Sequence, residues 1–401
     1  MLKKNAIENR IIEIIYLVFL GIYAGIAFSS STTFFIRWNP TFLLVTRILL
    51  ICFTFYKILR EDRWKVHEVV LVFLIGVSLM LSYYLNGWTY MGDSALIFEL
   101  VLLVIAARGL DGDRIIKVYM CVILALLLVT AFAALTGHIN NYVYTKASHD
   151  YKPRMSYGTV YPTDFAAHIM SLVLCYLWTR KERKPWQAII PFTMAVFCLV
   201  FCDTRLTSLC LLLLAVGALI PAGILTGLGD RIPESVKKVT SGIAVYSVPV
   251  MAFIMLLISR FYSDSNPVLR LVNNALNNRL YYGRMGFENY DTNLFGQRVI
   301  QIGSGGFASV GKEYFFIDCS YESVLLRYGV FVLIALLAAY TYIAFTEKKK
   351  GNYFRLFLVA VMAVLFSIEH HMPELGYMPF ILLMLSANST NKDSKTGEVS
   401  E

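Results

Sequence analysis

The amino-acid sequence predicts an all-α polytopic membrane protein, and three observations support that fold class. Of its 401 residues, 57% are hydrophobic and only 16% are charged, a composition that the core of a soluble protein cannot absorb. Apolar runs of about 20 residues recur along the chain, and a run of that length is what an α-helix needs to cross a bilayer. Lysine and arginine collect in the short segments between these runs, which is typical of membrane proteins.

The apolar runs predict about twelve membrane-spanning helices. The run that begins at Ile11 lacks a small-residue cleavage site, so we expect a first span rather than a removable signal peptide. The predicted spans cover residues 11–29, 40–58, 67–85, 94–108, 115–136, 162–179, 187–203, 206–225, 239–259, 321–345, 356–371 and 376–387. Together they form one transmembrane domain, residues 1–387. The polar tail, residues 388–401, is expected to be disordered and cytoplasmic.

Basic residues give the expected orientation. With the N-terminus in the cytoplasm, every inner loop carries lysine or arginine, as the positive-inside rule requires. An even number of spans then leaves the C-terminus in the cytoplasm too. These loops account for the formal net charge of +9, so we expect no nucleic-acid partner. The long polar segment 260–320 falls outside the cell, and we expect a multi-pass plasma-membrane protein with an extracytoplasmic site.

The first half of segment 260–320 has the pattern of an amphipathic helix. Ser265 or Asn266 can cap its start, and Pro267 suits its first turn. Four apolar residues then recur at three- and four-residue steps on one face: Leu269, Val272, Leu276 and Leu280. The pattern predicts one helix from Pro267 to about residue 290.

Two arginines, Arg279 and Arg284, would lie at the edges of this apolar face if the helix is continuous. The helix then has two interpretations. It is a lid over a lipid-linked anionic substrate, or it is a surface helix whose arginines reach lipid headgroups. Residues 293–320 are rich in glycine and predict a loop.

Among the arginines on the predicted outer side of the membrane, five are candidate site residues: Arg154, Arg205, Arg279, Arg284 and Arg327. The guanidinium fork matches phosphate oxygens and keeps its charge at any physiological pH, so we expect these residues to bind a diphosphate. Arg205 is the sharpest candidate, because a short turn between two spans holds it at the membrane boundary. The alternatives for Arg205 are a local pair with Asp203 and a contact with a lipid headgroup.

Acid–base candidates lie on the same side. Asp318, Glu369 and His370 can each accept a proton from a reacting hydroxyl group, and the sequence does not choose among them. His370 and its neighbour His371 can equally be interfacial residues of a helix end. Elsewhere, His168 is expected to hydrogen-bond a neighbouring helix.

Arg47 and Glu99 are charged residues in the interior of predicted spans; a structural pair and a functional role are both open for them. The sequence has no Walker loop and no His/Cys cluster with metal-ligand spacing. We therefore expect no metal and no cofactor.

Four groups of residues carry a resemblance to a known family through their order and spacing. They are residues 279–280 (RL) followed by 293–297 (NLFGQ), 318–321 (DCSY) running on to 325–329 (LLRYG), 154–164, and 203–205 (DTR). These stretches resemble motifs of Gram-positive capsular and exopolysaccharide repeat-unit polymerases, which belong to the O-antigen polymerase/ligase superfamily. The chain departs from the pattern at Cys319 and Asp164, where asparagine is commoner in the family.

The resemblance implies a metal-independent membrane glycosyltransferase. Its substrate would be an oligosaccharide linked to undecaprenyl diphosphate, and its product a longer glycan transferred to the terminal hydroxyl of an incoming repeat unit. Arginines would stabilise the departing diphosphate, and the chain-length regulator and flippase of the same pathway would be partners. Two alternatives stay open: a glycan ligase of the same superfamily, and a flippase or other transporter of a lipid-linked sugar.

Overall fold

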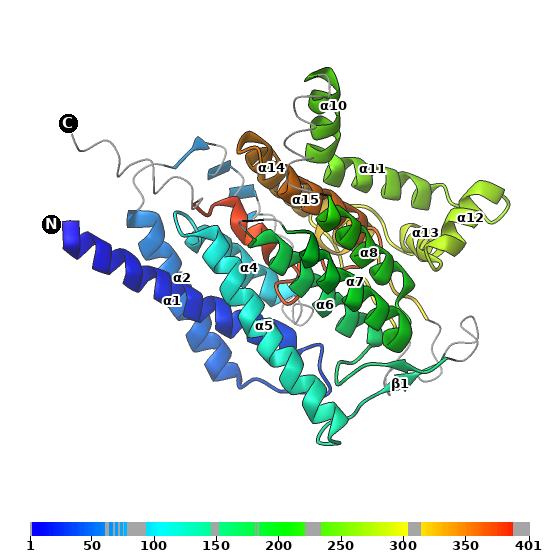
Figure 1. The fold of residues 1–401 in the computed structure, drawn as a ribbon, viewed down its shortest axis with the longest axis horizontal. Coiled ribbons are helices and arrows are strands. Elements are labelled where there is room, and N and C mark those ends of the chain that lie inside the picture. The colour runs from blue at the N-terminus through cyan, green and yellow to red at the C-terminus, as the bar shows by residue number, and fades with distance from the viewer. Residues whose placement is uncertain are drawn as a thin grey trace.

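The computed structural model describes residues 2–60, 64–66, 69–70, 73–74, 76–77, 94–145, 152–180, 182, 184–220, 234–303 and 314–387 (Figure 1). This part of the chain is all-α apart from two short antiparallel strands, β1 (Val143–Tyr144) and β2 (Arg154–Met155). The prediction of an all-α protein is confirmed.

Helices cover most of the predicted apolar runs that the structure describes, although not always with the predicted bounds. They are α1 (Leu2–Ser29), α2 (Pro40–Arg60), α4 (Ser94–Ala106), α5 (Gly112–Leu135), α6 (Pro162–Trp178), η3 (Pro185–Ala188), α7 (Ile189–Phe197), η4 (Cys198–Cys202), α8 (Arg205–Leu219), α10 (Glu234–Val245), α11 (Ser247–Arg260), α12 (Pro267–Ala275), α13 (Arg279–Asn289), α14 (Ser320–Lys349), α15 (Tyr353–Leu365) and η6 (Pro379–Met384).

Within the described residues, five stretches of helix are long and apolar enough to cross a membrane: Ile7–Ser29, Pro40–Arg60, Gly112–Leu135, Pro185–Cys202 and Ser320–Lys349. Four shorter apolar helices accompany them, and many large apolar side chains on these helices face outward, where lipid would cover them. These features are those of a membrane protein.

The predicted count of twelve spans is not confirmed. The last predicted span, 376–387, contains only a six-residue 3-10 helix, η6. Such a helix rises about 2.0 Å per residue, so η6 is far shorter than the roughly 30 Å of a hydrocarbon core. The third predicted span, 67–85, and the tail 388–401 lie largely or wholly outside the described residues.

The predicted span 239–259 is two helices, α10 and α11, with different directions (Figure 1). Pro249 explains the break, because a proline has no N–H and its ring clashes with the carbonyl group four residues earlier. That carbonyl belongs to Val245, the last residue of α10.

The predicted amphipathic helix is also two helices, α12 and α13. Asn266 caps α12, since its side chain accepts hydrogen bonds from two backbone N–H groups. Asn266 is one of the two residues that were predicted as candidate caps. The helix then ends, because Asn277 and Asn278 have φ angles of 52° and 65°. Asparagine tolerates this left-handed conformation better than most residues. Arg279 therefore begins a second helix instead of flanking a continuous stripe.

Polar side-chain contacts join segments that are far apart in the sequence. Arg47 on α2 donates to Glu99 on α4 over 2.6 Å, so the predicted pairing of these two charges is present. His168 lies 2.9 Å from the hydroxyl of Ser31, so its partner is in the turn after α1 and not in a neighbouring helix as predicted. At the far ends, Arg355 binds Asp113 at 2.7 Å, which joins the start of α15 to the start of α5.

Candidate functional site

A cavity of about 960 Å³ lies where several helix ends meet. Its wall includes residues from the C-terminal end of α1, the N-terminal ends of α4, α6, α8 and α14, and the turn between α12 and α13. Two irregular segments, 298–303 and 369–377, complete it. Because these helices alternate in direction, the cavity collects segments that are far apart in the sequence at one end of the bundle.

Seven of the eight predicted site residues line this cavity: Arg154, Arg205, Arg279, Arg327, Asp318, Glu369 and His370. The eighth, Arg284, lies outside it. Arg284 pairs with Glu288 on the next turn of α13 and donates to the carbonyl of Arg260 over 2.6 Å. Its position fits a structural role for this side chain.

Asp203 lies close to two of the arginines, Arg205 and Arg154. The π-helical turn η4 ends at Asp203, whose φ of 48° turns the chain sharply into α8. Arg205 approaches the Asp203 carboxylate at 3.7 Å while its side chain stays 55% exposed. The local pair and the cavity-facing position, which the sequence left as alternatives, are therefore both present.

Arg154 is the buried member of this group. It is the first residue of β2, and its Nε donates to the carbonyl of Cys202 over 3.2 Å. Burial lowers the pKa of Arg154, and the nearby charge of Asp203 opposes that shift. The arginine stays positively charged at neutral pH, because the unperturbed pKa of a guanidinium is above 12.

Arg279 is held by backbone carbonyl groups. Its Nε donates to Ile368 over 2.8 Å and its Nη1 to Leu276 over 2.9 Å. Its Nη2 lies 3.8 Å from a carboxylate oxygen of Asp318. The buried guanidinium is thus fixed in position with one edge toward Asp318 and the cavity.

Arg327 is positioned by a kink in α14. Gly329 has φ 89° and ψ 174°, which interrupts the helix. The N–H of Val330 then donates to Asn293 over 3.1 Å, and the carbonyl of Arg327 accepts from Gln297 over 3.2 Å. The NLFGQ and LLRYG stretches, which the sequence singled out separately, are therefore bound to each other.

Ser320 ties the start of α14 to the segment after α15. Its hydroxyl donates to the carbonyl of Glu369, and the N–H of Met372 donates to the same hydroxyl over 3.1 Å. These bonds bring Glu369 to the same wall as Asp318. Glu369 accepts a hydrogen bond from Thr207 on α8 over 3.0 Å. Burial raises the pKa of Glu369 to about 7, although the charge of Arg279 lowers it.

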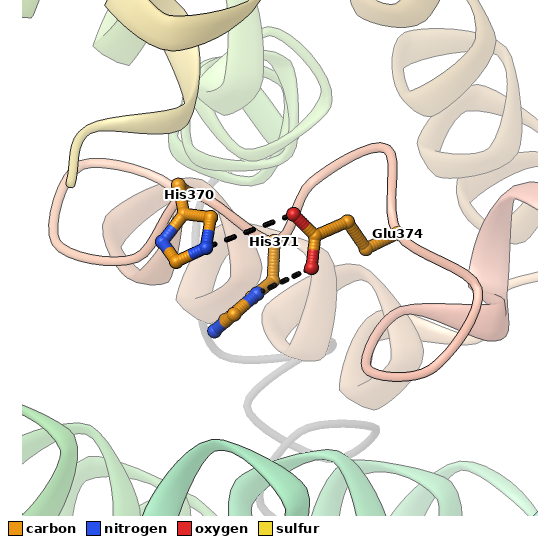
Figure 2. A group of neighbouring side chains, drawn as sticks. All are labelled: His370, His371 and Glu374. Carbon is orange, nitrogen blue, oxygen red and sulfur yellow. Dashed lines mark hydrogen bonds and ion pairs between the residues drawn. The ribbon is translucent and has the colours of Figure 1, made fainter. Parts of the chain in front are cut away.

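His370, His371 and Glu374 form a compact group in the turn that follows α15 (Figure 2). Nδ1 of His371 lies 2.7 Å from one carboxylate oxygen of Glu374, and Nε2 of His370 lies 3.7 Å from the other. Burial lowers the pKa of each imidazole to about 3. Both rings are therefore neutral at pH 7, and His370 is a weak base there.

Sequence reasoning did not identify several of the polar residues that line the cavity. Glu374 belongs to the predicted outer turn but carried no signal of its own, and Arg298 lies in the glycine-rich stretch read as a loop. Three amides also line the cavity: Asn274 at the end of α12, and Asn277 and Asn278 in the turn between α12 and α13. The run of asparagines was the available signal for this turn, because asparagine favours left-handed positions.

Comparison with known proteins identifies no relative: no family model, no curated protein and no solved structure matches the chain.

Proposed function

We propose that the cavity binds the diphosphate of a lipid-linked oligosaccharide, and that the protein polymerises repeat units of an exported polysaccharide. One observation carries the proposal: four of the predicted arginines, from four distant parts of the chain, line the same cavity. Guanidinium groups arranged in this way suit the charge and the oxygen geometry of a diphosphate. The resemblance in the motif stretches supplies the class of reaction.

The arginines divide into two kinds. Arg154 and Arg279 are buried and held by backbone carbonyl groups, so they provide a fixed positive potential. Arg205 is exposed to the cavity and would contact the phosphate oxygens directly. Each donor placed where charge develops on a leaving group contributes on the order of 3 kcal/mol to the transition state.

In the proposed reaction, the terminal hydroxyl of the incoming unit attacks the anomeric carbon of the growing glycan. A carbon–oxygen bond forms there as the bond to the diphosphate breaks, and the diphosphate leaves with the electron pair. A carboxylate accepts the hydroxyl proton. Among the three predicted acceptors we favour Glu369, because Asp318 faces Arg279 and His370 faces Glu374, whereas Glu369 contacts the neutral hydroxyl of Thr207.

The position of the cavity supports a reaction site over a transport path. Its wall is made of helix ends on one side of the bundle, whereas a transporter needs polar residues along a path through both leaflets.

Complementation of a deletion strain tests the proposal. Arg205→Ala should insert normally and abolish long polymer, because it removes an exposed phosphate ligand. Arg284→Ala is the matched control, since that arginine lies outside the cavity, and it should restore full-length polymer. Normal chain length with Arg205→Ala would refute the assignment. In the deletion strain itself, single lipid-linked repeat units indicate a polymerase, and unattached full-length polymer indicates a ligase.

A further inference from the structure

We infer that His370, His371 and Glu374 form a binding site for one divalent transition-metal ion of the Zn²⁺ class on the wall of the cavity. The ligand atoms of the three residues all lie within 4.8 Å of one another. Figure 2 shows the carboxylate of Glu374 facing both imidazoles, with a separate oxygen toward each ring. This inference goes beyond the proposed reaction and departs from the metal independence that the family resemblance implies.

The ligand atoms, which all lie within 4.8 Å of one another, would have to move by up to about 1.4 Å to surround an ion. Adjacent ligand atoms of a tetrahedral Zn²⁺ with bonds of about 2.0–2.1 Å lie about 3.4 Å apart. The distance from His370 Nε2 to Glu374 is 3.7 Å, which is too long for a hydrogen bond and near that value. The distance from His371 Nδ1 to Glu374 is 2.7 Å. This contact is a hydrogen bond that would open by about 0.7 Å as the ion replaces the proton.

The donor set selects the class of ion. Two imidazole nitrogens and one carboxylate are the three protein ligands of one common type of zinc site, which keeps a further position open. Mg²⁺ and Ca²⁺ prefer oxygen donors throughout, so they fit this site poorly. Both imidazoles are kept from water: the side chain of His371 is only 6% exposed and that of His370 19%.

The surroundings allow the positive charge of an ion. The positive charges of Arg279 and Arg327 oppose a further positive charge at His370. On the other side, the charges of Glu369 and Glu374 act on Asp164, and the charge of Glu374 acts on Glu369. A cation at Glu374 would reduce the repulsion among these carboxylates. All three ligands also line the cavity, so the open position of the ion would be available to a hydroxyl or phosphate oxygen of a bound molecule.

Metal binding to the purified full chain tests the inference without any glycan substrate. The protein in detergent is stripped with a chelator, dialysed against Zn²⁺, and its bound metal is measured by elemental analysis and calorimetry. We expect one Zn²⁺ per chain and no comparable binding of Mg²⁺. His371→Ala and Glu374→Gln should each weaken binding by more than about 100-fold, because even changes to residues behind a metal ligand cost about 10–100-fold.

Two matched controls use residues of the same types outside the cavity. His138→Ala and Glu288→Gln should keep wild-type affinity, and so should Arg205→Ala, which separates this inference from the diphosphate proposal. Co²⁺-loaded wild-type protein should show the absorption of nitrogen and oxygen ligands without sulfur charge transfer. That spectrum decides the question even if a ligand variant fails to fold. Lack of stoichiometric Zn²⁺ binding by the wild type, sulfur ligation, or full binding by both ligand variants would overturn the inference.

Discussion

Two arginines of α13 that look equivalent in the sequence have different positions. Arg279 is buried against the carbonyls of Ile368 and Leu276 and lines the cavity, whereas Arg284 pairs with Glu288 on the helix surface. The sequence alone could predict that arginines gather on one side of the membrane, because the order of the apolar spans assigns each loop to a side. It could not separate these two, because their difference depends on the left-handed asparagines that end α12.

A substitution at Glu369 tests the proposal that this residue accepts the proton. In Glu369→Gln the amide oxygen can still accept from Thr207, so the local structure should persist while the proton acceptor is lost. We expect polymer formation to fall by about 10²–10⁴-fold, the usual contribution of a general base. The readout is glycan chain length in the complemented strain at matched protein levels. Glu288→Gln serves as the control, and wild-type chain length in Glu369→Gln would exclude this residue as the proton acceptor.

At the scale of elements, apolar periodicity identified helices but not their interruptions. Pro249 and the Asn277–Asn278 pair were local signals within stretches read as single helices, and each marks a break. Gly329 was read as part of a family motif, and its role in a kink depends on a partner segment. That segment contains Gly296, whose added Cβ would lie 2.2 Å from the carbonyl oxygen of Arg327. Such long-range contacts leave no periodic trace in a sequence.

The close approach of these glycines makes a prediction about the α14 kink. A Cβ at Gly329 would lie 2.4 Å from the backbone of Gly296 and Leu294, so Gly329→Ala should displace the segment that holds Arg327. Gly351 has a similar positive φ of 72° with no atom within 4 Å of the added Cβ. Gly351→Ala should therefore show only the backbone strain, on the order of 1–3 kcal/mol.

The measurement for this pair is the thermal denaturation midpoint of each purified variant in detergent, followed by size-exclusion chromatography. Gly329→Ala should have the lower midpoint of the two and reduced polymer formation. Equal midpoints, together with wild-type polymer from Gly329→Ala, would show that the contact between the two stretches does not position the site.

In the whole molecule, the helices alternate in direction, and this places the cavity and the basic helix ends at opposite ends of the bundle. The end of α1, the starts of α4, α6, α8 and α14, and the segment that follows α15 surround the cavity. The starts of α5 and α15 meet at the other end through Arg355 and Asp113. The sequence predicted this separation through its basic loops. It did not predict that the last apolar run folds as the short helix η6, because hydrophobicity alone does not distinguish a span from a buried segment.

The predicted orientation can be tested by the accessibility of single cysteines to a membrane-impermeant thiol reagent. In a background without the native cysteines, Ser263→Cys follows α11 near the cavity end, and Lys184→Cys precedes η3 among the basic residues at the opposite end. Both positions are exposed. Because basic loops are retained in the cytoplasm, Ser263→Cys should be labelled in intact cells and Lys184→Cys only after permeabilisation. The reverse pattern would place the arginine cavity in the cytoplasm, where an exported lipid-linked glycan could not reach it.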